Sequence, residues 1–147
     1  MIAKNLGDVH TKFRLNFYRQ IFKRLEKKQG ALTAIETFCM EVINALKLPT
    51  VNQFAEFLQI SQANAAYKVG RLVEKGYINK KQSTNDKREY HLEVTDKFKS
   101  DYDISATFIK TVAQRIENYF DAEDLLTLND FLGVISNELI PEVVLES

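Results

Sequence analysis

Apolar residues near the start of the chain recur at the spacing of a helix. Over residues 8–28 an apolar side chain returns at every fourth position, and cations occupy positions between them. The repeating apolar positions are Val9, Phe13, Phe17, Ile21 and Leu25. A stripe of this period is typical of an amphipathic helix that buries one face. We therefore predict one long helix over residues 8–28.

Three shorter helices follow, and each begins at a residue that can cap it. The capping residues are Thr33, Thr50 and Ser61. Each threonine stands three residues before a Glu or a Gln, which is the spacing of a capping box. The hydroxyl of Ser61 can likewise accept a hydrogen bond from a free backbone N–H group in the first turn. The predicted helices cover residues 33–46, 53–58 and 61–75, and Gly76 ends the last of them. The second and third are joined by a tight turn, which makes a helix-turn-helix.

Beyond residue 76 the apolar period changes from helical to alternating. This change predicts two strands, 77–81 and 90–94, which the polar turn 83–88 joins into a β-hairpin, or wing. Two further apolar stripes predict helices over residues 95–120 and 121–140. The predicted fold class is therefore mainly α with a small β-hairpin wing (α+β): a winged helix-turn-helix with long N- and C-terminal helices.

Size and composition place the chain among globular proteins. With 147 residues, of which 45% are apolar, we expect a single domain over residues 1–147. Neither a stretch of about 18 apolar residues nor an apolar leader occurs, so we expect a cytoplasmic protein with no membrane contact. The lone cysteine, Cys39, cannot form an internal disulfide, which agrees with a reducing compartment.

Motifs for metal binding or catalysis do not occur in the sequence. His10 and His91 are far apart, and no Cys, His and Asp residues have the spacing of a metal site. The five glycines never cluster into a phosphate-binding loop, and no nucleophile motif is present. Cys39 lies between Phe38 and Met40 on a predicted helix, which favours a buried structural thiol over a redox sensor. We therefore predict no metal, no cofactor and no enzymatic activity.

Charge is distributed unevenly although the net charge is zero. Residues 1–60 carry nine Lys/Arg and five Asp/Glu, residues 61–100 carry the same numbers, and residues 101–147 carry two and ten. The three segments therefore have net charges of +4, +4 and −8. Because a polyanion responds to the local potential rather than to the sum, the basic middle of the chain favours a nucleic-acid partner.

One face of the predicted helix 61–75 carries polar and cationic side chains. When successive residues are placed at the rotation of an α-helix, these side chains fall within an arc of roughly 100° around the helix axis. They are Asn64, Tyr67, Lys68, Arg71 and Lys75, with Gln62 near the helix start. Such a stripe suits the major groove of duplex DNA, where amides and cations read base edges and further cations hold phosphates. Base contacts are assigned to Gln62, Asn64, Tyr67 and Lys68, and phosphate contacts to Arg71 and Lys75. The alternative is an ordinary solvated face.

The wing offers a second cationic surface. Its cations are Lys80 and Lys81 on the first strand, and Lys87 and Arg88 near the tip. They can follow the DNA backbone or enter a narrow minor groove, whose negative potential favours arginine. Asp86 would repel phosphate, so we expect it to hold an arginine and to fix the turn. The alternative is a generic polar hairpin turn.

Two runs of residues on either side of the wing turn form a recognisable pattern. Residues 76–80 read Gly-Tyr-Ile-Asn-Lys, and residues 86–95 read Asp-Lys-Arg-Glu-Tyr-His-Leu-Glu-Val-Thr. They resemble the wing of the multiple-antibiotic-resistance regulator (MarR) family, and Asp86 and Arg88 match the Asp and Arg of that family's wing. Arg71 also matches the arginine late in that family's recognition helix. Ala66 and Tyr67 depart from the common Ser/Thr-Arg pair, so the resemblance does not imply a particular operator sequence.

The resemblance implies a homodimeric transcription regulator, usually a repressor, that binds a pseudo-palindromic operator in duplex DNA and is released by a small-molecule inducer. Residues 1–30 and 96–147 would then supply the dimerisation helices, and residues 31–95 the DNA-binding lobe. Aromatic residues of the first helix could line a ligand pocket or belong to the dimer core; these are Phe13, Phe17, Tyr18 and Phe22. The alternative function is a winged-helix module that binds protein without specific DNA binding, with Tyr67 and Tyr77 as apolar anchors.

Overall fold

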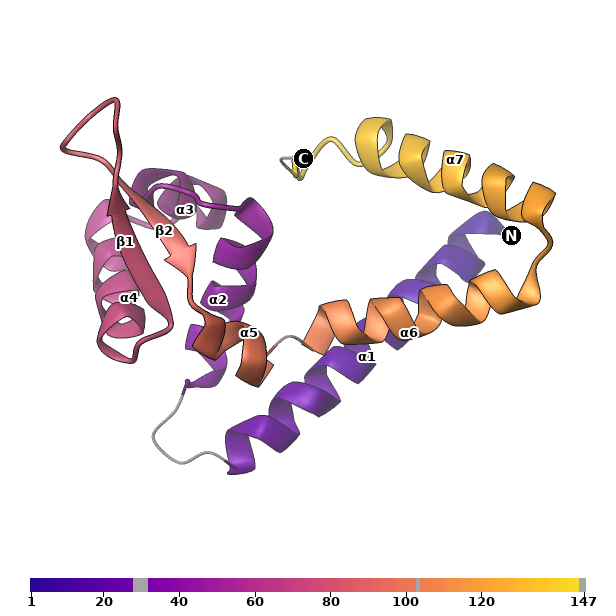
Figure 1. The fold of residues 1–147 in the computed structure, drawn as a ribbon, viewed down its shortest axis with the longest axis horizontal. Coiled ribbons are helices and arrows are strands. Elements are labelled where there is room, and N and C mark those ends of the chain that lie inside the picture. The colour runs from indigo at the N-terminus through magenta and orange to yellow at the C-terminus, as the bar shows by residue number, and fades with distance from the viewer. Residues whose placement is uncertain (28–31, 103, 146–147) are drawn as a thin grey trace. The chain divides into compact units, whose positions relative to one another are not determined.

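The computed structural model describes residues 1–27, 32–102 and 104–145, and it divides the chain into two compact units. The first unit, Met1–Ile104, holds α1 (Ile2–Lys27), α2 (Ala34–Leu46), α3 (Val51–Leu58), α4 (Gln62–Glu74), β1 (Ile78–Gln82), β2 (Tyr90–Val94) and α5 (Asp96–Tyr102). The second, Ser105–Ser147, holds nearly all of α6 (Ile104–Tyr119) and the whole of α7 (Ala122–Glu138). Figure 1 shows these elements in chain order. The predicted fold class, mainly α with a β-hairpin wing, is confirmed.

Helices α2, α3 and α4 begin where the sequence places their caps. Thr33 Oγ1 accepts from the backbone N–H of Glu36 at 3.2 Å, and Ser61 Oγ accepts from that of Asn64 at 3.1 Å. Thr50 and Gln53 form the complete capping box, because each side chain bonds the backbone N–H of the other residue. Each cap satisfies N–H groups that the first turn of a helix leaves without a partner.

A turn in the left-handed conformation joins α3 to α4. Gln59 has a φ of 55°, and its N–H bonds back to the carbonyls of the last turn of α3. The N–H of Ile60 donates to the carbonyl of Ala55 at 3.1 Å. These bonds end α3 and let Ser61 open α4 two residues later, which completes the predicted helix-turn-helix.

The wing is an antiparallel hairpin in which Ile78 pairs with Val94 and Gln82 with Tyr90. Its first strand begins one residue later than predicted. The reason is that the N–H of Tyr77 donates to the carbonyl of Leu72 in α4 at 3.0 Å, so Tyr77 still belongs to the end of the helix. Gly76 makes this ending possible because its φ of 80° is open to glycine without strain.

The hydrophobic core of the first unit lies between α2, α3, α4, the wing and α5. Its fully buried members are Met40, Ile43, Phe54, Ala65, Val69, Leu72, Ile78, Leu92 and Phe98. The backbone adds one tie across this core, since the N–H of Leu92 in β2 donates to the carbonyl of Pro49 at 2.8 Å. The lobe is therefore closed by both packing and hydrogen bonding, and it presents the outer faces of α4 and of the wing to solvent.

The terminal helices differ from the sequence-based expectation in extent. Helix α1 begins at Ile2 rather than at residue 8, because the chain continues as a helix through Gly7, where the ion pair between Lys4 and Asp8, one turn apart, adds support at 2.7 Å. The single helix predicted over residues 95–120 corresponds to two helices, α5 before residue 103 and α6 after it. Residue 103 itself lies outside the described residues.

Candidate nucleic-acid interface

The exposed face of α4 carries most of the residues expected to read DNA. Gln62, Asn64 and Arg71 are exposed, and the side chain of Tyr67 is 70% exposed. On the opposite face of the same helix, Ala65, Val69 and Leu72 are fully buried in the core. The helix is therefore fixed by its apolar side while its amide, phenol and guanidinium groups reach outward.

The first turn of α4 is tied to α3 through an amide pair that sequence reasoning missed. The Nε2 of Gln62 donates to the Oδ1 of Asn52, ten residues earlier on α3. This contact joins the two helices of the helix-turn-helix at the end of α4 where side chains reach base edges in docked proteins of this type. Nothing in the local sequence signals it, because Asn52 by itself resembles any polar residue in the first turn of a helix.

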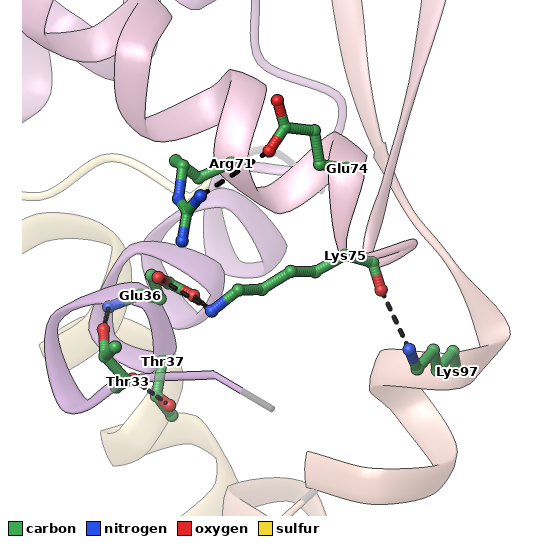
Figure 2. Close-up of polar contacts among 7 residues, drawn as sticks. All are labelled: Thr33, Glu36, Thr37, Arg71, Glu74, Lys75 and Lys97. Carbon is green, nitrogen blue, oxygen red and sulfur yellow. Dashed lines mark hydrogen bonds and ion pairs between the residues drawn. The ribbon is translucent and has the colours of Figure 1, made fainter. Parts of the chain in front are cut away.

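Lys75 does not lie on the exposed face of α4, where the angular projection placed it. Its ammonium lies 2.6 Å from the Oε2 of Glu36 in α2, and the two side chains are only 19% and 15% exposed. Figure 2 shows the lysine side chain reaching from the end of α4 to the first turn of α2. The projection at 100° per residue placed Lys75 beside Arg71, but Lys75 is the C-cap, one position beyond the last helical residue. Its side chain is therefore directed toward the protein rather than along the exposed face.

Arg71, by contrast, keeps its place on the exposed face. Its Nη1 lies 3.7 Å from the Oε2 of Glu74, three residues along the helix, and both side chains are largely exposed (Figure 2). A surface pair of this kind contributes at most about 1 kcal/mol. Arg71 can therefore exchange the glutamate for a phosphate at little cost.

The tip of the wing is fixed by hydrogen bonds of its own side chains. The Oδ1 of Asp86 accepts from the backbone N–H of Arg88 at 2.9 Å and from its Nε at 3.3 Å. The Nε2 of Gln82 donates to the carbonyl of Lys87 at 2.7 Å, which ties the end of β1 to the same turn. The side chain of Arg88 is nevertheless 91% exposed, so its guanidinium is oriented by Asp86 and remains accessible to an anion.

The two lysines of β1 differ in their surroundings. Lys80 and Lys81 are both exposed, but Lys81 forms an ion pair with Glu93 on the neighbouring strand. The pair reduces the positive potential that Lys81 offers to a phosphate. The exposed cations of the wing therefore include Lys80 on β1 as well as Lys87 and Arg88 near the tip.

The aromatic residues expected at a ligand pocket or dimer core lie along α1. Phe13 and Phe17 are half-buried, whereas Tyr18 and Phe22 are exposed. The rings of Phe17 and Tyr18 lie 6.1 Å apart. In the same helix Ile21 is buried, so α1 is covered on one side and open on the other.

A separate hollow of about 630 Å³ lies within the first unit. It is bordered by the end of α2, the base of the wing and the start of α5, and its cationic lining residues are Lys47, Lys97 and Lys99. The Nζ of Lys97 is already occupied, because it donates to the carbonyl of Lys75 at 2.8 Å and lies 4.5 Å from the centre of the Tyr77 ring.

Cys39 is buried in the core of the first unit. Burial raises the pKa of its thiol, Lys68 opposes this effect, and Glu36 adds to it. A raised pKa keeps the thiol protonated and unreactive at neutral pH.

Among the described residues, no three His, Cys, Asp or Glu side chains come together in a group that could hold a metal ion. No helix in the described part of the chain has both the length and the apolar character needed to cross a membrane.

Comparison with known proteins agrees with this geometry. Residues 32–90 match the model of the MarR family. Streptococcus pneumoniae FabT, solved in complex with DNA, is 20% identical, with 94% of each chain covered and a TM-score of 0.61. The transcriptional regulator Tm0710 from Thermotoga maritima is 15% identical, with 94% of this chain and 96% of that chain covered and a TM-score of 0.63. YusO from Bacillus subtilis is 18% identical, with 93% of each chain covered and a TM-score of 0.55.

At these identities the solved structures show a shared fold, and the family model identifies the lobe that carries α2, α3, α4 and the wing. A search of curated proteins finds no match. Residues 32–90 thus form a domain that matches the MarR family model, and the chain shares the winged helix-turn-helix fold of the solved structures.

Proposed function

We propose that the protein is a homodimeric repressor that binds a pseudo-palindromic site in duplex DNA and leaves it when a small molecule binds. The observation that carries the proposal is the exposed face of α4, where amide, phenol and guanidinium groups stand on a helix whose other face is fully buried. The accessible and pre-oriented Arg88 at the wing tip supports it. The DNA complex of S. pneumoniae FabT, which shares this fold, supports it as well.

In the proposed complex α4 lies in the major groove and the wing reaches the flanking minor groove. Gln62, Asn64, Tyr67 and Lys68 would contact base edges, and Arg71 would contact a phosphate. Lys80, Lys87 and Arg88 would follow the backbone or enter the minor groove, where a narrow groove favours arginine. Asp86 would hold Arg88 in position through the hydrogen bonds described above.

Selection of bound sequences from a randomised duplex pool, at two salt concentrations, tests DNA binding. We expect an inverted repeat to be enriched, and we expect its binding to weaken as salt rises because phosphate contacts release counterions. Recovery of random sequences only, with no effect of salt, would reject the proposal. For repression, a reporter whose promoter overlaps the selected site should lose expression when the protein is present, and increased expression would indicate an activator.

Exposed apolar surface on the terminal helices supports the homodimer. Every described residue of α7 is at least partly exposed, and its most exposed large apolar side chains are Leu126, Phe131 and Leu132, followed by the C-cap residue Leu139. Helix α1 likewise exposes Ile2, Leu6, Val9 and Phe22. A helix that exposes several large apolar side chains is expected to bury them against another protein surface. Light scattering should give twice the mass of one 17.0 kDa chain, and a monomer would contradict the proposal.

The hollow of about 630 Å³ beside the base of the wing supports release by a ligand. Its volume is within the range of small-molecule sites, and its charged lining residues are the cations Lys47, Lys97 and Lys99 and the carboxylates Glu93 and Asp96. An acidic ligand would pair its carboxylate with Lys47 or Lys99. A panel of small aromatic carboxylic acids, titrated into the complex with the selected site, should include compounds that lower DNA affinity. Substitution of Lys47 by Ala should weaken that effect, and an unchanged response in the variant would place the ligand elsewhere.

The alternative of a protein-binding module loses one of its two supposed anchors. Tyr77 is only 2% exposed and is packed in the core of the lobe, so it is not available to a partner. Tyr67 remains exposed, but it stands among residues suited to DNA rather than on an apolar patch.

A further inference from the structure

The end of α4 is tied to the beginning of α2 by a half-buried ion pair between residues that are far apart in sequence. The Nζ of Lys75 lies 2.6 Å from Oε2 and 3.0 Å from Oε1 of Glu36. The two side chains are 19% and 15% exposed, which is well below the exposure of the other ion pairs on the described surface of α4 and the wing. Figure 2 shows this contact as a bridge between two helices rather than along one.

Both charges also lie where the helices favour them. Glu36 is in the first turn of α2, where free N–H groups favour an anion, and Lys75 is the C-cap of α4, where free carbonyls favour a cation. Glu36 does not complete a capping box with Thr33; its carboxylate faces Lys75 instead. Removing either partner leaves the other charge largely buried without its counter-charge, which is more costly than losing an exposed pair.

The junction between α4 and the wing is held from a second side by the start of α5. The Nζ of Lys97 donates to the carbonyl of Lys75 at 2.8 Å, and the hydroxyl of Thr95 donates to the carbonyl of Gly76 at 2.8 Å. Lys75 is therefore bound by Glu36 of α2 through its side chain and by Lys97 of α5 through its backbone carbonyl (Figure 2). These contacts fix the C-terminal end of α4, while Ala65, Val69 and Leu72 pack its length against the core.

From this geometry we infer that Glu36 and Lys75 are positioning residues for DNA recognition, and that Lys75 is not a phosphate contact. The inference rests on the proposed function of α4. Helix α4 has 13 residues, so its base-reading end is about 18 Å from the junction. A tilt of about 5° at the junction moves that end by about 1.6 Å, which exceeds the range of a few tenths of an ångström over which a hydrogen bond keeps its strength.

The substitution Glu36→Gln separates this role from simple electrostatics. It removes the negative charge that faces Lys75, so any account in which Lys75 contacts phosphate predicts tighter binding to all DNA. The positioning role predicts the opposite for the selected site. We expect the ratio of specific to non-specific affinity to fall about tenfold or more, because the bases are read from a displaced helix while phosphate attraction is unchanged.

The experiment measures the binding of the selected duplex and of a scrambled duplex over a salt series for the wild type and four variants. The variants are Glu36→Gln, Lys75→Met, Lys75→Arg and, as the phosphate-contact control, Arg71→Ala. We expect Lys75→Met to lose specificity without a change in salt slope, Lys75→Arg to retain specificity because it keeps the pair, and Arg71→Ala to reduce the slope by about 0.9. Circular dichroism and thermal melting confirm that each variant is folded.

The inference is overturned if Glu36→Gln tightens both duplexes equally, or if Lys75→Met reduces the salt slope as Arg71→Ala does. It is also overturned if Lys75→Met binds both duplexes as the wild type does. A wild type that shows neither a preferred sequence nor a salt slope would reject the proposed function itself, and this inference with it. The wild-type curves therefore distinguish the two failures.

Discussion

Replacing Lys87 and Arg88 together by alanine tests whether the wing tip contacts the DNA backbone. Both side chains are exposed, Arg88 to 91%, and the tip is held by Asp86 and by Gln82 from the end of β1. The pair between Arg88 and Asp86 lies in solvent, where such pairs contribute at most about 1 kcal/mol. Its loss should therefore leave the free energy of unfolding nearly unchanged, and any effect on DNA binding can be assigned to contacts with DNA.

The magnitude follows from the number of phosphates that the tip neutralises. Each contact contributes about −0.9 to the slope of log affinity against log salt, so losing two contacts should flatten the slope by about 1.8. Between about 50 and 200 mM salt, a slope change of this size corresponds to a factor of about ten in affinity. The variant should bind much more weakly than the wild type at low salt and should approach it at high salt.

Fluorescence anisotropy of the labelled selected duplex, measured over that salt range, gives both slopes. Thr84→Ala is the matched control, because it removes an exposed uncharged side chain from the same turn and should leave the slope unchanged. Parallel lines for the double variant and the wild type would refute the assignment of the wing tip to phosphates. A loss of affinity confined to the selected sequence would instead assign the tip to base recognition.

Four further outcomes are expected. Asn64→Ala and Tyr67→Ala should change which sequences are selected, by about 1 to 3 kcal/mol per affected base pair, whereas an unchanged selection would remove them from base contact. Leu72→Ala should lower the free energy of unfolding by about 2 to 5 kcal/mol in denaturant titration, because it opens a cavity in the core, while the partly exposed Val73→Ala on the same helix should have a much smaller effect. Burial raises the pKa of the Cys39 thiol, so a thiol reagent should react much more slowly with the folded than with the unfolded protein at neutral pH. Because the pKa of this thiol is higher in the folded than in the unfolded protein, the stability that the protonated thiol contributes is present at neutral pH and is lost as the pH rises through the folded pKa. The wild type should therefore lose stability relative to Cys39→Ala in that alkaline range. Identical pH profiles of stability would contradict this.

The elements that could be predicted from the sequence are those specified by local signals. Thr33, Thr50 and Ser61 cap their helices as expected, because a capping bond spans only three residues and depends on little else. The wing follows from a change of apolar period, and its start was wrong by one residue because Tyr77 bonds back to α4. The start of α1 was wrong by several residues because glycine only weakens a helix, and Gly7 lies within it.

The parts of the candidate site that could not be predicted depend on contacts between elements. Angular projection placed Lys75 on the exposed face of α4, yet its position at the C-cap and the nearby Glu36 direct it inward. The contact between Gln62 and Asn52 depends on how α3 and α4 pack, which no spacing along the chain encodes. Local sequence therefore identifies the helix that faces outward, and tertiary packing decides which of its end residues are available to DNA.

The most direct test of the central claim is a hydroxyl-radical and base-methylation footprint of the protein on its selected duplex. If two copies of α4 occupy successive major grooves, base protection should appear in two patches whose centres are about one helical turn, or 10 to 10.5 base pairs, apart. Backbone protection should flank each patch on the outer side, where the wing lies. A single asymmetric patch, or protection that covers the backbone uniformly without protected bases, would contradict the account.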